Sequence, residues 1–548
     1  MENEYEKDHQ HVEEPYINGS KEANNYTDDM EGGLEMPERT LQRQLKNRHI
    51  AMISIGGVIG TGLFLGTANS LKNGGPLGLL LGYAIMGSIV FAVMNCLGEM
   101  ISFLPVPGGH IKLAERLVDP ALGFAMGWNY WYNWVIVLPA ELSAAAVLIG
   151  YWTNGSINNA VWITLCLIVV VTINMFGARA YGEAEFWFAS IKILTIVGLI
   201  ILGIIIAAGG GPSHVATGVQ YWKNPGPFVQ YEGIPGALGQ FLGFFSVLIN
   251  AAFSYIGTEI VAIAAGEAAN PRKNIPKAIK KVYIRICLFY ILGTFIIGLL
   301  VSSADPRLGS SAGAGTAASS PFVIAIEDAG IPVLPSIINA CLLTSAWSAA
   351  SSDLYTSSRA LFGLSVSGSA PKIFRKVNRF GLPYLALALS VAFSLLAYMA
   401  VSKNAWVVFN YFGNMTSICG LITWCGIAIT YLRFHSGMTK QNIDRTTLPY
   451  RSPLGAFGGW YVLVSLCIIL FFSGWEVFLA GHWDTSTFIT TYLPIPFAFI
   501  LYFGYKLVKR TKIIPVQDID FVTGVREFDD EVDEEPPTTV LGKFFNAL

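Results

Sequence analysis

The sequence has few charged residues: Asp, Glu, Lys and Arg make up 13% of its 548 residues, against about 25% in soluble domains. Hydrophobic residues reach 53%, and the mean hydropathy is +0.51. A water-soluble fold is therefore a poor fit. Acidic and basic residues nearly cancel, with a formal net charge of −2, so the charge balance indicates no class of partner.

The sequence also lacks the motifs of several chemistries. Its seven cysteines are scattered and form no C-x-x-C pair, so they predict neither a disulfide framework nor a zinc site. It has no P-loop, no H-E-x-x-H, and no G-x-G-x-x-G that follows a strand. We therefore expect no cofactor, no bound metal, no nucleic-acid partner and no enzyme activity. Uphill transport would have to draw its energy from an ion gradient.

What the sequence has instead is long apolar runs. A membrane-spanning helix needs about 20 apolar residues. Twelve such runs lie at 50–69, 77–98, 121–150, 159–177, 186–207, 241–265, 286–303, 332–358, 382–401, 405–432, 459–480 and 487–505. The N-terminus is polar and acidic and carries no signal peptide, so the first apolar run is expected to direct insertion.

The distribution of basic residues tests this topology. Cytoplasmic loops of membrane proteins carry an excess of Lys and Arg. With the N-terminus in the cytoplasm, the inner segments hold 26 of the 35 Lys and Arg residues, and the outer loops hold four: Lys72, Lys223, Arg307 and Lys403. An odd number of spans would remove this asymmetry. We therefore predict twelve helices over 49–512, with both termini in the cytoplasm.

The two tails, 1–48 and 513–548, are acidic and low in apolar residues. This composition is typical of disordered or loosely tethered segments. Solvated tails without any chemistry are one interpretation. The other is regulation through tail lysines such as Lys7 and Lys21, with ubiquitin-ligase machinery as the partner.

The first apolar run is crowded with glycine: "ISIGGVIGTGLFLGT" (53–67) holds five. Each glycine in a helix interior costs roughly 0.5–1 kcal/mol relative to alanine. One explanation is a break in the helix. A break at membrane depth would free N–H groups that suit a carboxylate and carbonyl groups that suit an ammonium, the two ends of an amino acid. The other explanation is close helix packing through small residues.

A second segment favours the break. In the sixth run, "IGTE" at 256–259 echoes "IGTG" at 59–62 of the first run. The two runs lie five spans apart. Five-helix halves that are related by inversion place their interrupted helices at the first and sixth positions. The sequence therefore predicts breaks at Gly60–Gly62 and Ile256–Glu259, facing each other near mid-membrane.

Several longer stretches carry a resemblance to a known family. They are "RHIAMISIGGVIGTGLFLG", "GGPLGLLLGYAIMGSIVFAVMNCLGEM", "VDPALGFAMGWNYWYNW", "GEAEFWFASIKILTIVGLI" and "GEAANPRKNIPKAIKKV". From about Arg39 to Val525 the chain resembles a fungal amino acid permease of the yeast amino acid transporter family, within the amino acid–polyamine–organocation superfamily.

The resemblance implies an all-α fold and a site. The fold would be a 5+5 inverted repeat, with repeat one at about 50–207, repeat two at about 241–432, and two extra helices at about 459–505. The substrate would lie between the broken first and sixth helices. The implied binding residues there are Gly57, Ile59, Gly60, Thr61, Gly62, Tyr255, Ile256, Gly257, Thr258 and Glu259.

Three ionisable residues lie deep in the predicted spans, where charges cost roughly 2.5–3.5 kcal/mol on insertion scales. The resemblance places Glu259 at the substrate or proton site, and gives Glu141 a role in specificity or proton coupling. Lys192 would occupy the region that sodium fills in sodium-coupled relatives, where it could exchange a proton. For each, a structural ion pair or hydrogen bond is the alternative. Glu99, at the end of the second span, is either a gate-bracing acid or a coupling residue.

Side-chain recognition is less constrained. Asn133 and Val137 share a helix face with Glu141 and resemble specificity positions of the family, while Tyr255 and Ile256 flank the sixth-helix break. The aromatic run "WNYWYNW" (128–134) is interpreted as interfacial anchoring and packing rather than as a substrate cage. His110 falls in a cytoplasmic loop.

The predicted function is a plasma-membrane permease that imports L-amino acids, neutral or proline-type or dicarboxylic, by proton symport. The absence of an intramembrane cation other than Lys192 favours neutral substrates. A non-transporting amino acid sensor with this fold and an uncoupled facilitator are the alternatives. A sugar transporter of the other common twelve-helix fold fits less well, because the echo relates helices one and six.

Overall fold

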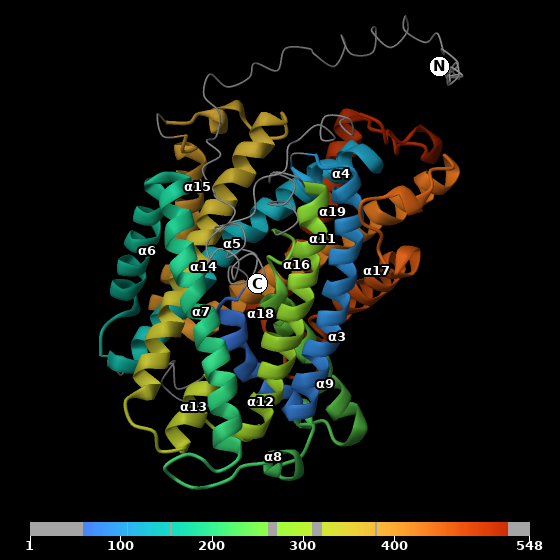
Figure 1. The fold of residues 1–548 in the computed structure, drawn as a ribbon. Coiled ribbons are helices and arrows are strands. Elements are labelled where there is room, and N and C mark those ends of the chain that lie inside the picture. The colour runs from blue at the N-terminus through green and yellow to red at the C-terminus, as the bar shows by residue number, and fades with distance from the viewer. Residues whose placement is uncertain are drawn as a thin grey trace, which may run out of the picture. The chain divides into compact units, whose positions relative to one another are not determined.

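The computed structural model describes residues 59–106, 108–153, 156–260, 271–308, 320–378 and 381–523. Their side chains are described except at 178, 179, 271–275, 278 and 280. Every regular element in these ranges is a helix, as Figure 1 shows. The predicted all-α membrane class is confirmed.

The first half of the described chain forms one π-helical turn and five α-helices. They are η2 (Gly62–Gly66), α3 (Thr67–Phe103), α4 (Gly109–Leu117), α5 (Pro120–Thr153), α6 (Asn159–Met175) and α7 (Gly177–Ala207). The first and second predicted spans meet inside α3, where Gly75 has a φ of +73° and interrupts the helical backbone. A Cβ at Gly75 would lie 2.7 Å from the carbonyl oxygen of Pro227, so glycine is required there.

The second half continues with helices of very different lengths. It comprises α8 (Gln220–Lys223), η3 (Tyr231–Gly233), α9 (Gly236–Tyr255), α11 (Pro271–Arg285), η4 (Ile286–Ile291), α12 (Leu292–Leu300), α13 (Pro321–Asp328), α14 (Leu334–Val366), η6 (Lys372–Arg375), α15 (Tyr384–Ser394), η7 (Leu395–Val401) and α16 (Ala405–Lys440). The C-terminal elements are η8 (Arg445–Thr447), α17 (Gly455–Phe472), η9 (Trp475–Phe478), α18 (Thr485–Tyr492), α19 (Pro494–Lys509) and η10 (Val516–Asp518).

Each of the twelve predicted apolar runs overlaps a helix in the described ranges. Nine helical stretches there are long and apolar enough to cross a membrane, judged by length and composition. α6 is apolar but has 17 residues and is shorter than those nine. The count of twelve spans therefore stays a prediction.

The helix α5 lies in the interior, packed against α14, α16 and α4 (Figure 1). In its most apolar stretch 83% of the residues are buried. The helix α19 is at the other extreme, with 11%. Its outer residues Leu507 and Val508 are 78% and 79% exposed, and Phe471 of α17 is 74% exposed. Apolar surface of this kind is typical of a lipid-facing belt.

Residues 513–523 follow α19 and pack against the helices, although their composition groups them with the tail. The Arg116 side chain of α4 donates to the carbonyl oxygens of Asp520 and Thr523, at 2.9 and 2.8 Å. Phe521 is buried, with its ring centroid 5.6 Å from that of Phe434 on α16. Residues 1–48 and 524–548, the rest of the two predicted tails, lie outside the described part of the chain.

Candidate substrate cavity between two helix ends

Two helix ends meet where the sequence predicts breaks. The helix α9 ends at Tyr255. Ile256 is extended with ψ 144°, and Gly257 has a φ of +89°, so the backbone leaves the helix. In the first span, Ile59 and Gly60 are not helical and the helix begins at Thr61. The residues before Ile59 lie outside the described chain. The predicted first break, Gly60–Gly62, is fully described, and only Gly60 of its three residues is non-helical.

A cavity lies between these ends. Its walls come from both helix ends and from α5, α14 and α16, and they mix glycines, apolar groups and a few polar groups. The lining residues are Gly60, Gly62, Gly257, Trp134, Val137, Phe253, Ile256, Ile260, Ala349, Glu141, Ser254, Ser352, Asp353 and Thr416. Ligand sites commonly have this composition: mostly apolar walls with a small number of polar groups.

The cavity gathers part of the predicted site. Gly60, Gly62, Val137, Ile256 and Gly257 line it, together with Glu141. The others described surround it without lining it: Ile59, Thr61, Asn133, Tyr255, Thr258 and Glu259, all buried. Gly57 lies outside the described residues.

The first-span glycines serve two different purposes. A Cβ at Gly62 would lie 2.9 Å from the Cα of Ser254, so α9 approaches the first helix as closely as two backbones allow. A Cβ at Gly60 would meet only Glu141 Oε1 at 3.6 Å and Ala349 Cβ at 3.8 Å, which are ordinary contacts. Close packing explains Gly62, whereas Gly60 leaves room beside the cavity wall.

Glu141 connects α5 to the start of the first helix. The Thr61 hydroxyl donates to Glu141 Oε1 at 2.8 Å, and the side chain is buried. The other carboxylate oxygen, Oε2, has no hydrogen-bond partner among the described residues. Glu141 therefore holds the helix end with one oxygen and keeps the other uncommitted.

Lys192 lies in a buried ion pair, as the alternative interpretation of this residue expects, but with a partner that the sequence analysis did not identify. Its Nζ is 3.8 Å from Oε1 of Glu185, on the same helix α7, and both side chains are fully buried. The hydroxyl of Ser348 on α14 donates to Glu185 Oε2 at 2.5 Å. Glu185 directly precedes the apolar run 186–207, so the sequence analysis did not recognise it as a buried partner of Lys192.

Asp353 is a second residue that the sequence reasoning missed. It lines the cavity from α14, is 4% exposed, and its Oδ2 has no hydrogen-bond partner in the described structure. The signal was available, because an aspartate inside the apolar run 332–358 is as unusual as a glutamate in the third span.

Glu259 and Arg285 have partners other than Glu141. The indole N–H of Trp424 donates to Glu259 Oε2 at 3.2 Å, and Arg285 donates to the Thr258 hydroxyl at 3.0 Å. Arg285 is 1% exposed. The predicted spans leave Lys192 as the only intramembrane cation, but Arg285 is a second buried cation in the described structure. The sequence analysis missed it because Arg285 directly precedes the apolar run 286–303.

The aromatic run in α5 is divided between packing contacts and the cavity wall. Trp134 lines the cavity, 3.1 Å from where a Cβ on Gly257 would be. Trp131 instead packs edge-to-face on Phe393, with centroids 5.6 Å apart, and Trp128 packs on Trp131. Packing accounts for most of the run, and Trp134 is the exception.

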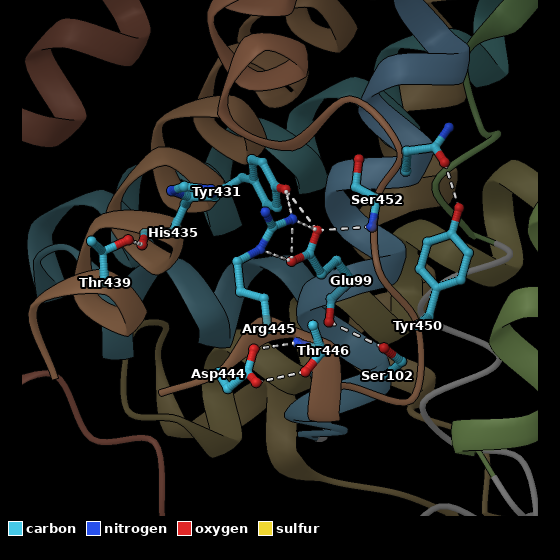
Figure 2. A network of polar contacts seen from close by, with 11 residues as sticks. Glu99, Ser102, Tyr431, His435, Thr439, Asp444, Arg445, Thr446, Tyr450 and Ser452 are labelled. Atoms are coloured by element: carbon cyan, nitrogen blue, oxygen red, sulfur yellow. Dashed lines mark hydrogen bonds and ion pairs between the residues drawn. The ribbon is translucent and has the colours of Figure 1, made fainter. Parts of the chain in front are cut away.

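Glu99 belongs to a separate polar network, shown in Figure 2. Arg445 donates to both of its carboxylate oxygens, at 2.8 and 2.9 Å. The Tyr431 hydroxyl and the Ser452 backbone N–H donate to Oε2 at 2.7 and 2.9 Å. Since four donors hold this buried carboxylate, the bracing interpretation of Glu99 agrees with the geometry better than a coupling role.

A second, smaller cavity shares a lining residue with the first one. Gly66, Asn250, Phe409, Asn410, Gly413, Asn414 and Ser417 line it, together with Phe253. Phe253 thus lies in the wall of both cavities, and its ring packs edge-to-face on Phe409 with centroids 5.6 Å apart. Phe253 is the one lining residue that the two cavities share.

Comparison with known proteins identifies the family of this chain. Residues 49–516 match the family described as "Amino acid permease". The chain is 45% identical to the dicarboxylic amino acid permease of Saccharomyces cerevisiae, over 90% of this chain and 82% of that protein. It is 42% identical to the proline-specific permease of Emericella nidulans, over 91% of each chain. It is 40% identical to the lysine-specific permease of Saccharomyces cerevisiae, over 93% of this chain and 83% of that protein.

A solved structure shares the fold. The manganese transporter of Eremococcus coleocola superposes with a TM-score of 0.52, over 86% of this chain and 98% of that chain. The two sequences are 12% identical, so the similarity concerns the fold alone.

Proposed function

Because the chain belongs to the amino acid permease family, we propose that it is a plasma-membrane carrier that imports L-amino acids by proton symport with alternating access. The observation that supports this best is the cavity between the two helix ends. The asymmetric distribution of Lys and Arg supports an orientation with both termini in the cytoplasm.

The two helix ends favour binding of the carboxylate and ammonium groups that all amino acids share. The helix that begins at Thr61 presents N–H groups without a partner in their own helix, and its positive dipole end favours the substrate carboxylate. The helix α9 ends at Tyr255 with its negative dipole end toward the same region. That end and the carboxylate of Glu141 favour the substrate ammonium. Gly60 keeps this region open for the substrate backbone.

The side-chain end of the cavity favours neutral substrates. Trp134, Val137, Phe253 and Ile256 give it apolar walls, and no Lys or Arg is among the described residues that line it. The relatives' names cover proline, lysine and dicarboxylic substrates, so similarity does not select among them. We propose neutral or proline-type amino acids over dicarboxylic ones. The test is competition of all twenty amino acids against one labelled substrate, and strongest competition by aspartate and glutamate would contradict the proposal.

Phe253 is proposed as the residue that closes the cavity toward the outside. Following the predicted orientation, α9 runs inward, and Phe253 precedes the break on its outer side. Its place between the two cavities supports a gate, with the smaller cavity as the outer entrance.

Proton coupling is proposed to involve Glu259, Glu141 and Lys192. A proton-driven carrier needs at least one group that takes up a proton on one side and releases it on the other, so the surroundings of that group have to change during transport. We expect Glu259→Gln to lose concentrative uptake. Lys192→Ala should lose the dependence on the pH gradient and keep exchange, with the exposed Lys223→Ala as the matched control.

Uptake into proteoliposomes, with and without an imposed pH gradient, tests these statements beside counterflow at equal pH. If all three neutralised variants still concentrate substrate under the gradient, the coupling assignment is wrong. The same experiment decides between the proposal and its alternatives. A sensor would give no uptake, and a facilitator would equilibrate substrate without concentrating it.

A further inference from the structure

Asp353 is a cavity residue to which the proposed function assigns no role. It lies on α14, one helical turn after Ala349, and both residues line the cavity. Its side chain is 4% exposed and its Oδ2 has no hydrogen-bond partner in the described residues. Buried polar atoms are rarely left in this state, so an unpartnered carboxylate oxygen in a cavity wall calls for an explanation.

Glu141 also lines this cavity, from α5, and presents the same feature. Its Oε1 accepts a hydrogen bond from Thr61, and its Oε2 has no partner in the described structure. The cavity thus has two buried acids, each with one uncommitted oxygen. The geometry provides acceptors for positive charge, and no lysine or arginine among the described lining residues meets them.

The charged groups around Asp353 determine the net charge of this buried cluster. Glu141 on α5 and Glu185 and Lys192 on α7 interact with it electrostatically. On its own helix, the neighbouring Ser352 hydroxyl is 3.0 Å from the hydroxyl of Tyr181 on α7. Of the other elements packed against α14, α6 and α15 carry no charged residue, while α13 carries Glu327 and Asp328 and η6 carries Lys372 and Arg375. On α14 itself, Arg359 lies over the Tyr355 ring, and none of these groups is among the charges that act on Asp353.

This cluster has more negative than positive charge. Three carboxyl groups face one ammonium group, so full ionisation would leave two uncompensated negative charges in a buried region. Burying an unpaired charge is strongly unfavourable. Two positive charges are therefore needed to make the cluster neutral. The ammonium group of an amino acid substrate supplies one of them, and a proton supplies the other.

We propose that Asp353 carries the transported proton, that Glu141 is the partner of the substrate ammonium, and that one proton accompanies each amino acid. The assignment rests on the proposed symport. Glu141 is fixed beside Gly60 by the Thr61 hydroxyl, an arrangement that suits a charged acceptor close to the substrate backbone. Asp353 has no such donor on Oδ2, which suits an uncharged acid that bears a hydrogen.

The proton step balances in this way. In the outward-open state a proton from external water forms an O–H bond at Oδ2 of Asp353. The neutralised cluster can then close over the bound amino acid at lower cost. In the inward-open state the same bond breaks, the electron pair stays on the carboxylate, and the proton passes to cytoplasmic water. The empty carrier then returns to the outward-open state, in which Asp353 can take up another proton.

The test uses the full-length protein in proteoliposomes, with neutral amino acids as substrates and Asp353→Asn as the variant. An imposed gradient of one pH unit with one coupled proton should allow the wild type about tenfold accumulation, since each 1.4 kcal/mol is a factor of ten. We expect the accumulation ratio of Asp353→Asn to fall to about one. Its counterflow at equal pH should stay within about threefold of the wild type and become independent of pH.

Two further variants separate coupling from folding. Asp353→Glu keeps the acid and should restore accumulation, with its counterflow displaced along the pH axis. Asp328→Asn, on the half-exposed end of α13, removes an aspartate elsewhere and should behave as the wild type. If Asp353→Asn does not fold, the pH profile of Asp353→Glu decides: a profile identical to that of the wild type would overturn the proposal.

The remaining outcomes are also decisive. Accumulation by Asp353→Asn at the wild-type ratio would overturn the role of Asp353 and leave the proposed symport intact. A measured ratio of two protons per amino acid would overturn the charge balance. Accumulation by the wild type that needs a sodium gradient at equal pH, or no accumulation under either gradient, would overturn the proposed symport and this inference with it.

Discussion

The most direct test of the buried polar groups concerns His110, which the sequence placed in a cytoplasmic loop. The residue lies in α4, outside the apolar spans, and is fully buried. Its ring packs edge-to-face on Tyr130, with centroids 5.1 Å apart. Neither ring nitrogen has a hydrogen-bond partner among the described residues. Burial alone lowers the pKa of His110 from 6.5 to about 4, because the imidazolium would lose its hydration.

The lowered pKa of His110 gives the size and the direction of the change in stability with pH. The difference between 6.5 and about 4 corresponds to about 3 kcal/mol of stability, at 1.36 kcal/mol for each pKa unit. The unfolded chain binds the proton first, so stability falls as the pH drops through 6.5 and continues to fall until about 4. At neutral pH the two unpartnered nitrogens cost a further amount, on the order of 1–3 kcal/mol.

We therefore expect His110→Phe, which keeps a ring against Tyr130, to raise the thermal unfolding midpoint at neutral pH. The variant should also lose the part of the acid sensitivity between pH 6.5 and 4 that His110 contributes. The measurement is thermal unfolding in detergent at a fixed scan rate across this range. His214→Asn, at an exposed position with a φ of 52° that Asn tolerates, is the matched control. An unchanged acid slope in His110→Phe would refute the reasoning.

Two further predictions concern packing. Gly62→Ala should destabilise the protein by on the order of 1–3 kcal/mol through overpacking against α9. Gly60→Ala should instead keep the melting temperature and slow uptake. Equal melting temperatures for the two variants would argue against the close approach at Gly62. Arg445→Ala should cost about 3 kcal/mol, because it leaves the buried Glu99 without its cation. The exposed Arg451→Ala is its control in the same thermal unfolding assay, and equal losses in the two would show that the ion pair contributes little.

The sequence predicts the helical class, the position of the sixth-helix break and the neighbourhood of Glu141 because each leaves a local pattern. An apolar run is visible by its length, and the echo of Gly60–Gly62 at Ile256–Glu259 is visible by its spacing. The environment of Arg285 leaves no such pattern, and for Asp353 the sequence shows an acid in an apolar run but not its place in the cavity wall. Arg285 follows a lysine-rich inner segment, and nothing in the order of residues says that its side chain reaches Thr258. The two uses of glycine at Gly60 and Gly62 are also identical in sequence and differ only in distance to α9.

The buried acids differ from one another in one property that the structure alone reveals: how many donors hold them. Glu99 accepts four hydrogen bonds, so a change in its protonation would break a network that ties α3 to the segment after α16. Glu141 and Asp353 each keep an oxygen without a partner in the described residues, so a proton or an ammonium can arrive without breaking an existing bond. A carrier needs acids of the second kind at its substrate and acids of the first kind where helices must stay together. The same residue type in the same kind of apolar run serves both needs, and the donors around it decide which.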